Sequence, residues 1–151
     1  MTVFESGSEE ETRRFGEALL AELWPQGVLL LEGDLGSGKT VLAQGLARGL
    51  GIDPRQVQSP TFTLVREHAG VKGRLVHVDL YRLEPAEAAG VGLEELLAGP
   101  GIKVVEWAER LPFTWPGALR FKLERVRGIR GQVTNSRRIR NLSPNSEEEK
   151  R

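Results

Sequence analysis

The stretch Gly33-Asp34-Leu35-Gly36-Ser37-Gly38-Lys39-Thr40 fits the pattern G-x-x-x-x-G-K-[ST] and lies between a strand signal and a helix signal. Residues 28–31, which precede it, form a short apolar run of the length typical of a buried parallel strand. After it, apolar residues recur at helical spacing from Val41 to Leu50. Glycines let the backbone turn around an anion, and the helix that follows adds its positive N-terminal end. The stretch therefore predicts a phosphate-binding loop (P-loop).

Each residue type in the loop has an expected part in binding a nucleotide. Lys39 supplies a mobile positive charge for the β- and γ-phosphates, and the Thr40 hydroxyl is placed to ligate Mg²⁺. A dinucleotide fingerprint is disfavoured, because the glycines follow the order G-x-x-G-x-G and a lysine comes next. The simplest alternative is a glycine-rich turn with an incidental lysine. The residues expected to contact the nucleotide here are Asp34, Leu35, Gly36, Ser37, Gly38, Lys39 and Thr40.

The composition excludes several classes of protein. The chain has 151 residues, and its 21 basic and 21 acidic side chains cancel, so no overall charge favours nucleic acid or a membrane. There is no cysteine, hence no disulfide framework and no cysteine-based zinc site. Its apolar runs are short, and its first residues lack the pattern of a signal sequence. We expect one domain over residues 1–142, a disordered polar tail over 143–151, and a cytoplasmic location without membrane contact.

Two apolar runs end on an acidic residue, which predicts carboxylates at one edge of a sheet. Residues 75–78 lead to Asp79, and residues 102–105 lead to Glu106. Because ligands of open α/β sheets collect at the carboxyl ends of the strands, both acids are candidates for the site that the loop makes. Asp79 could hold Mg²⁺ or a metal-bound water, with a plain turn residue as the alternative, and Glu106 could hold the metal or orient a water. Trp107 is either a core aromatic or a surface for a nucleotide base or a partner.

The remaining segments complete an α/β fold. A short edge strand is expected at Val3 and Phe4, then a helix capped by Ser6 or Ser8. A hairpin turn is expected at 69–73, and short helical pieces at 85–90 and 92–97. Residues 118–124 alternate between apolar and polar and predict a half-exposed strand at an edge. The whole predicts a P-loop NTPase-like domain with a mostly parallel central sheet, flanking helices and an antiparallel edge.

Two segments leave alternatives open. Thr61 and Thr63 lie on one side of an extended segment, either as a polar sheet face or as a switch loop that reaches a γ-phosphate or its metal. Residues 125–142 carry six arginines and no acid. This basic stretch is either a solvated edge or a contact for phosphate or RNA. His77 is interpreted as an ordinary strand residue.

Four motifs follow one another in a characteristic order and spacing: Gly33 to Thr40, Ser59-Pro60-Thr61-Phe62-Thr63-Leu64-Val65, His77-Val78-Asp79-Leu80-Tyr81-Arg82 and Val105-Glu106-Trp107. In this combination the sequence resembles the TsaE family, small bacterial P-loop ATPases required for threonylcarbamoyladenosine synthesis on tRNA. The resemblance covers residues 5–124 and implies ATP and Mg²⁺ as cofactors. It also implies work with two partner proteins, TsaB and TsaD, and contact with tRNA only through that complex. Hydrolysis in the family resets the complex between rounds.

The resemblance also implies roles for single residues. Lys39 and Thr40 would bind phosphate and Mg²⁺, residues 59–61 would be a switch I segment that includes Thr61, Asp79 the switch II acid, and Glu106 the acid of the metal and hydrolysis site. Catalytic roles thus fall to Glu106, Asp79 and Lys39, and metal binding to Thr40, Glu106 and Asp79. The family usually ends in paired strands with a Gly-Arg turn, whereas this chain has its arginine-rich stretch there. The further residues expected at the nucleotide are Glu9, Thr12, Trp107 and Arg137.

Three functions compete at this point. The first is a TsaE-like ATPase, the second a small-molecule kinase on the same scaffold, and the third a module that assembles on nucleotide without hydrolysing it. A kinase usually has an arginine-bearing lid, and only Arg82 and Arg110 stand as isolated possibilities between residues 80 and 117. No arginine finger is evident within the chain, so slow hydrolysis that depends on partners is expected.

Overall fold

The computed structural model describes residues 2–58, 64–84 and 92–144. The switch-like residue Thr61, the helical piece at 85–90 and the end of the polar tail lie outside the described residues. The strands are β1 (Val3–Ser6), β2 (Val28–Glu32), β3 (Val65–Ala69), β4 (Arg74–Asp79), β5 (Ile102–Glu106), β6 (Leu119–Arg125) and β7 (Arg137–Asn141). The helices are α1 (Glu9–Leu23), α2 (Lys39–Gly49) and α4 (Leu93–Ala98), with 3₁₀ turns η1 (Pro54–Gln56) and η2 (Ala108–Arg110). Among the described helices, none combines the length and the apolar character that crossing a membrane requires.

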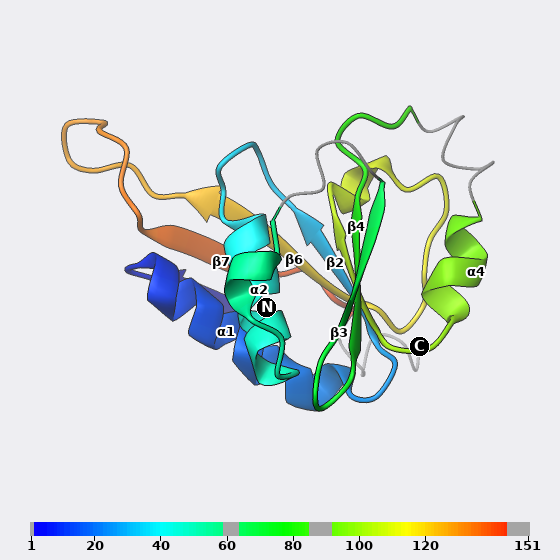
Figure 1. Ribbon diagram of the computed structural model, residues 1–151. Coiled ribbons are helices and arrows are strands. Elements are labelled where there is room, and N and C mark those ends of the chain that lie inside the picture. Colours follow the sequence, from blue (N-terminus) through cyan, green and yellow to red (C-terminus); the bar gives the residue numbers. More distant parts are fainter. Residues whose placement is uncertain (1, 59–63, 85–91, 145–151) are drawn as a thin grey trace.

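The seven strands form one mixed sheet in the order β1-β7-β6-β2-β5-β4-β3 (Figure 1). The four central strands β6, β2, β5 and β4 are parallel. β7 on one side and β3 on the other run antiparallel to them, and β1 pairs antiparallel with β7 at the outer edge. The expected α/β sheet with an antiparallel edge is therefore confirmed, and antiparallel strands border it on both sides. The carboxyl ends of β2, β4 and β5 lie at one edge, which is where the predicted acidic residues are.

The position predicted for residues 118–124 was wrong. These residues form β6, which lies between β2 and β7 and not at an edge of the sheet. The basic residues of β6 do not protect an open edge: Arg120, for instance, forms an ion pair with Glu32 of β2 at 2.5 Å. The strand that covers β6 is β7, which lies within the arginine-rich stretch. The short strand at Val3 and Phe4 is an edge strand, as predicted.

Two apolar layers cover the two faces of the sheet. Alternate residues of β2 point to opposite sides, so Leu29 and Leu31 pack under α1 and α2, whereas Leu30 packs on the side of α4. The residues of β5 divide in the same way, with Val104 in the first layer and Val105 in the second. Because both faces are covered, β2 and β5 are buried along almost their whole length, as their apolar runs predicted.

Glycines bring α1 and α2 into close contact. A Cβ atom on Gly16 would lie 2.2 Å from the carbonyl oxygen of Leu42, and one on Gly45 would lie 1.9 Å from that of Arg13. No real Cβ atom fits at such distances, so any side chain here would push the helices apart. This contact places the N-terminus of α1 beside the loop that leads into α2.

Candidate phosphate-binding site

The segment between β2 and α2, residues 33–38, is here called the glycine-rich loop. Three of its residues, Gly33, Gly36 and Gly38, have φ angles of +144°, +73° and +106°. A Cβ atom on Gly36 would lie 1.8 Å from Nη2 of Arg125. The backbone conformation therefore favours glycine at this position, and any side chain there would also displace the guanidinium of Arg125.

Lys39 is the first residue of α2, and its side chain folds back onto the glycine-rich loop. The side chain is buried, and its Nζ donates to the carbonyl oxygens of Gly33 at 2.5 Å and Asp34 at 2.9 Å. The ammonium also lies 4.4 Å from the centre of the Trp107 ring, a distance at which cation and π-system attract. Burial lowers the pKa of Lys39, although the nearby carboxylate of Glu106 opposes this change.

Thr40 and Glu106 join the start of α2 to the end of β5. The Thr40 hydroxyl lies 2.9 and 3.0 Å from the two carboxylate oxygens of Glu106, which is only 3% exposed. The same carboxylate forms a short hydrogen bond with Nε2 of His77, a fully buried residue of β4. Asp79 is the direct neighbour of Glu106 across the β4–β5 ladder, and its Oδ1 accepts a hydrogen bond from the backbone N–H of Tyr81 at 2.9 Å.

This arrangement has the chemistry that Mg²⁺ prefers. A hydroxyl and a carboxylate are hard oxygen ligands, and Mg²⁺ commonly takes one or two carboxylates together with waters and phosphate oxygens. Within the described ranges, no group of three or more His, Asp or Glu side chains is arranged to hold a metal without other ligands. The residues therefore fit a magnesium ion that is shared with a phosphate better than a site made by protein groups alone.

Trp107 follows Glu106 and closes this side of the site. Its φ and ψ angles are 59° and 43°, the left-handed region that a non-glycine residue adopts only at some energetic cost. Its ring packs 4.9 Å from that of Tyr81, and the guanidinium of Arg110 lies 5.7 Å from it. The strained backbone thus turns one aromatic face toward Lys39, while the ring also packs, half-buried, against the apolar layer on the α4 side, so that it combines features of both predicted alternatives.

Beside the glycine-rich loop lies a cavity of about 420 Å³. It brings together most of the predicted site residues, but neither Asp34 nor Asp79 lines it. Asp34 contributes its carbonyl oxygen to Lys39 and lines a neighbouring cavity on the other side of the loop. The cavity is lined by Glu9, Thr12, Leu35, Gly36, Ser37, Gly38, Lys39, Thr40, Val41, Glu106, Trp107, Arg125, Asn135 and Arg137.

Two arginines meet at the outer side of the glycine-rich loop. Arg125 and Arg137 are direct neighbours across the β6–β7 ladder, and each donates to the carbonyl oxygen of Gly36 at 3.1 Å. Burial, together with the positive charge of Arg125, lowers the pKa of Arg137. Nε of Arg137 is buried and has no hydrogen-bond partner among the described residues. Two like charges side by side and an unpaired donor form a place where an anion would be stabilised.

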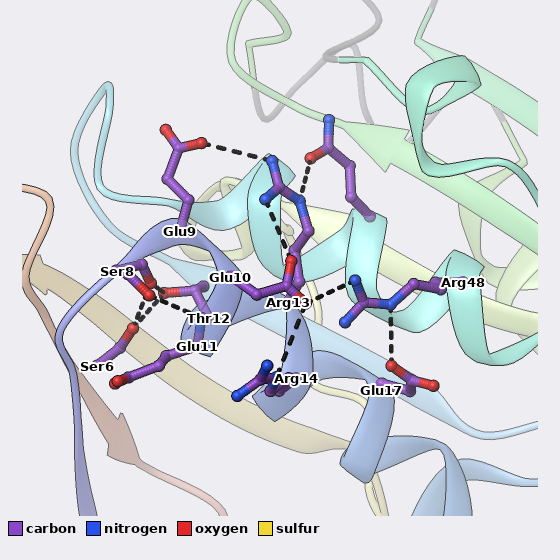
Figure 2. A network of polar contacts seen from close by, with 11 residues as sticks. Ser6, Ser8, Glu9, Glu10, Glu11, Thr12, Arg13, Arg14, Glu17 and Arg48 are labelled. Carbon is purple, nitrogen blue, oxygen red and sulfur yellow. Dashed lines mark hydrogen bonds and ion pairs between the residues drawn. The ribbon is translucent and has the colours of Figure 1, made fainter.

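The N-terminus of α1 also lines the cavity, through Glu9 and Thr12, and Figure 2 shows the polar contacts of these residues. Ser8 caps the helix by accepting from the N–H of Glu11 at 3.1 Å, so of the two predicted caps it is Ser8 that is used. The Thr12 hydroxyl is shared with Ser6 at 2.7 Å and is buried, while Glu9 is half exposed and pairs with Arg13 at 3.4 Å. Of these two residues predicted near the nucleotide, Glu9 has a polar side-chain group that is exposed to solvent, whereas the hydroxyl of Thr12 is buried.

Three residues of the site were missed by sequence reasoning. His77 could have been found, because it precedes Asp79 by two residues and therefore points to the same face of the sheet. Arg125 and Asn135 could not, since their place at the loop depends on the pairing of β6 with β7. That pairing also restores the paired strands that the arginine-rich stretch had put in question.

The fold and the site define a mixed α/β protein whose glycine-rich loop and Lys-Thr pair stand at the N-terminus of a helix. The model of the family described as "Threonylcarbamoyl adenosine biosynthesis protein TsaE" matches residues 6–135. The chain belongs to the TsaE family, as its motifs predicted.

Comparison with individual relatives supports the same family membership. A protein named tRNA threonylcarbamoyladenosine biosynthesis protein TsaE from a Nostoc species is 45% identical over 117 residues, 75% of this chain and 72% of its own. The protein of the same name from Bacillus subtilis is 46% identical over 107 residues, 68% of this chain and 66% of its own. Among solved structures, that of Bacillus subtilis YdiB superposes with a TM-score of 0.71 at 32% identity, covering 99% of this chain and 89% of that one.

Proposed function

We propose that this protein is a Mg²⁺-dependent ATPase of tRNA threonylcarbamoyladenosine synthesis, which acts in a complex with TsaB- and TsaD-like proteins and resets that complex by hydrolysing ATP. The observation that carries the proposal is the contact of Thr40 with Glu106 beside the glycine-rich loop. It joins the residue expected to ligate the metal to the acid expected to act on water. The family membership supplies the process in which this site works.

Binding of ATP would use both rims of the cavity. Backbone N–H groups of the glycine-rich loop, the N-terminus of α2 and the ammonium of Lys39 would hold the phosphates. Arg137, whose buried Nε has no hydrogen-bond partner within the described ranges, would add a charge-assisted hydrogen bond from the β7 side. The exposed Glu9 carboxylate and the Trp107 ring would contact the nucleoside part.

Hydrolysis would use the buried acids. Bound Mg²⁺ would neutralise charge on the phosphates, with Thr40, Glu106 and Asp79 as the residues that hold it directly or through water. Glu106 would also orient the attacking water. The hydrogen bond to His77 would hold the Glu106 carboxylate in place for this role. Asp79 does not line the cavity, which favours an indirect role through a metal-bound water.

The contacts of the arginines support the proposal that hydrolysis is slow without partners. Arg125 and Arg137 both donate to the carbonyl oxygen of Gly36, so we assign them to binding of the ground state. Arg110 is stacked on Tyr81 and Trp107. An arginine finger contributes on the order of 10³-fold or more to phosphoryl transfer, and we assign this missing help to the partner complex.

The test is ATP turnover by the purified protein, alone and with the TsaB–TsaD pair. Slow turnover that rises when the pair is added is the expected result. Turnover that ignores the pair but rises with a small hydroxyl-bearing metabolite would indicate a kinase. ATP binding that promotes assembly with the pair without any turnover would indicate a module that does not hydrolyse.

A further inference from the structure

The chain between β6 and β7, residues 126–136, projects from the body of the molecule and is here called the β6–β7 arm. In Figure 1 it is the orange segment that extends past the end of the sheet beside α1. The side chain of Ile129 near its tip is fully exposed, and Val133 is 61% exposed. Two aliphatic side chains in water on one short segment leave apolar surface that a partner could cover.

The arm has a shape of its own. The N–H of Gly128 donates to the carbonyl oxygen of Gln132 at 3.0 Å, and that of Gly131 donates to Gly128 at 2.9 Å. At the base of the arm, the N–H of Val126 donates to Ser136 at 3.0 Å. These bonds fold the arm back on itself and present Ile129 at a turn. Binding of this arm to a partner therefore costs less chain entropy than ordering an open loop of the same length would.

The charge of the arm has one sign. Arg127 and Arg130 are exposed and flank Ile129, and residues 125–142 contain neither an acid nor an aromatic residue. Aliphatic side chains gain nothing from phosphate groups, and binding of single-stranded RNA usually relies on aromatic rings that stack on bases. An apolar tip flanked by arginines is complementary to an apolar pocket bordered by carboxylates.

We propose that the β6–β7 arm is a docking element for a partner protein, which receives Ile129 in an apolar pocket with acidic residues at its rim. The identity of that partner as the TsaB–TsaD pair rests on the function proposed above. The base of the arm carries Asn135 and adjoins Arg137, and both line the cavity beside the glycine-rich loop. Docking of the arm therefore takes place next to the residues assigned to the nucleotide.

The experiment compares three variants of the full chain for binding to the TsaB–TsaD pair in the presence of ATP and Mg²⁺. Ile129→Asp removes the apolar tip, and the double variant Arg127→Glu with Arg130→Glu reverses the charge. Val71→Asp is the matched control, because Val71 is 94% exposed and lies in the β3–β4 turn. Thermal unfolding is measured for each variant and should not change, since the altered side chains are exposed. Binding to the pair is compared at saturating ATP, because reversing two charges beside the cavity can weaken ATP binding by itself.

We expect Ile129→Asp and the double variant each to weaken binding by about 10-fold or more, as loss of an interface anchor does, with Val71→Asp unchanged. Wild-type binding that neither arm variant alters would overturn the docking proposal and leave the proposed function standing. Failure of the wild-type protein to bind the pair would refute the proposed partners. If the double variant lost binding to unmodified tRNA while Ile129→Asp kept binding to both tRNA and the pair, the arm would be an RNA contact and not a protein contact.

Discussion

The cavity beside the glycine-rich loop has two walls that differ in construction. One wall is centred on Glu106, a buried acid at the end of β5 that accepts from the Thr40 hydroxyl at the start of α2 and is hydrogen-bonded from behind by the buried His77 of β4. The other is made by Arg125 and Arg137, which are more open to solvent and repel each other across an antiparallel ladder. The first wall fixes atoms in place, as chemistry on a phosphate requires. The second supplies charge, which acts over distance and tolerates looser geometry.

Lys39 stands between the two walls, and its removal should have the largest effect on binding. Lys39→Ala would delete the proposed charge-assisted contact with phosphate, worth about 1.5–3 kcal/mol, so ATP affinity should fall by roughly 10- to 100-fold in calorimetric titration. Lys72→Ala, in the distant β3–β4 turn, is the control and should bind as the wild type does. An affinity of Lys39→Ala equal to that of the control would refute the phosphate role of Lys39.

The hydrogen bond between His77 and Glu106 in the buried wall should contribute to the stability of the fold. His77→Leu leaves the Glu106 carboxylate without one of its partners, which should lower the free energy of unfolding by about 1–3 kcal/mol in urea titration. His68→Leu in β3 is the matched control, because Nε2 of His68 has no hydrogen-bond partner in the part of the chain that the structure describes. Equal stability of the two variants would mean that His77 does not hold Glu106 in solution.

The open wall should contribute less to binding than Lys39 does. Arg125→Ala should weaken ATP binding by only about 3-fold, because exposed charge is screened by solvent and salt, and the loss should shrink as salt is raised. Arg138→Ala is the control: it adjoins Arg137 in β7, but its side chain pairs with Glu5 at 3.1 Å. A loss as large as that of Lys39→Ala would show that the two walls do not differ as described.

The smallest effect expected is a dependence of ATP affinity on pH. Burial lowers the pKa of Lys39, and a bound phosphate would raise it again, so binding takes up a proton at alkaline pH. Affinity of the wild type should therefore fall as pH rises from neutral toward the ordinary pKa of lysine. Lys39→Arg, which stays charged, should bind more weakly but with a flatter pH profile. Parallel profiles for the two proteins would contradict the assignment.

The two walls also differ in how far the sequence predicts them. The glycine-rich loop, Thr40 and Glu106 follow from local patterns, because a parallel strand delivers the residue at its end to a known edge of the sheet. The arginine wall depends on the register of β6 with β7, which joins Arg125 to Arg137 across the projecting arm. Nothing in the alternation of β6 distinguishes an edge strand from one that a later strand covers, and its predicted edge position was wrong for this reason. The spacing of His77 to Asp79 predicts the face of the sheet to which His77 points, but its partner Glu106 lies on the neighbouring strand β5 and follows only from the β4–β5 pairing.

We propose that Glu106 acts in hydrolysis and not mainly in holding ATP. The most direct measurement is the turnover of Glu106→Gln with the TsaB–TsaD pair, alongside its ATP affinity in Mg²⁺. Glutamine keeps the shape of the side chain and removes its capacity to activate water. We predict a loss of turnover of about 100-fold or more, with ATP affinity changed only a few-fold. Unchanged turnover, or a loss of binding as large as the loss of turnover, would contradict the account.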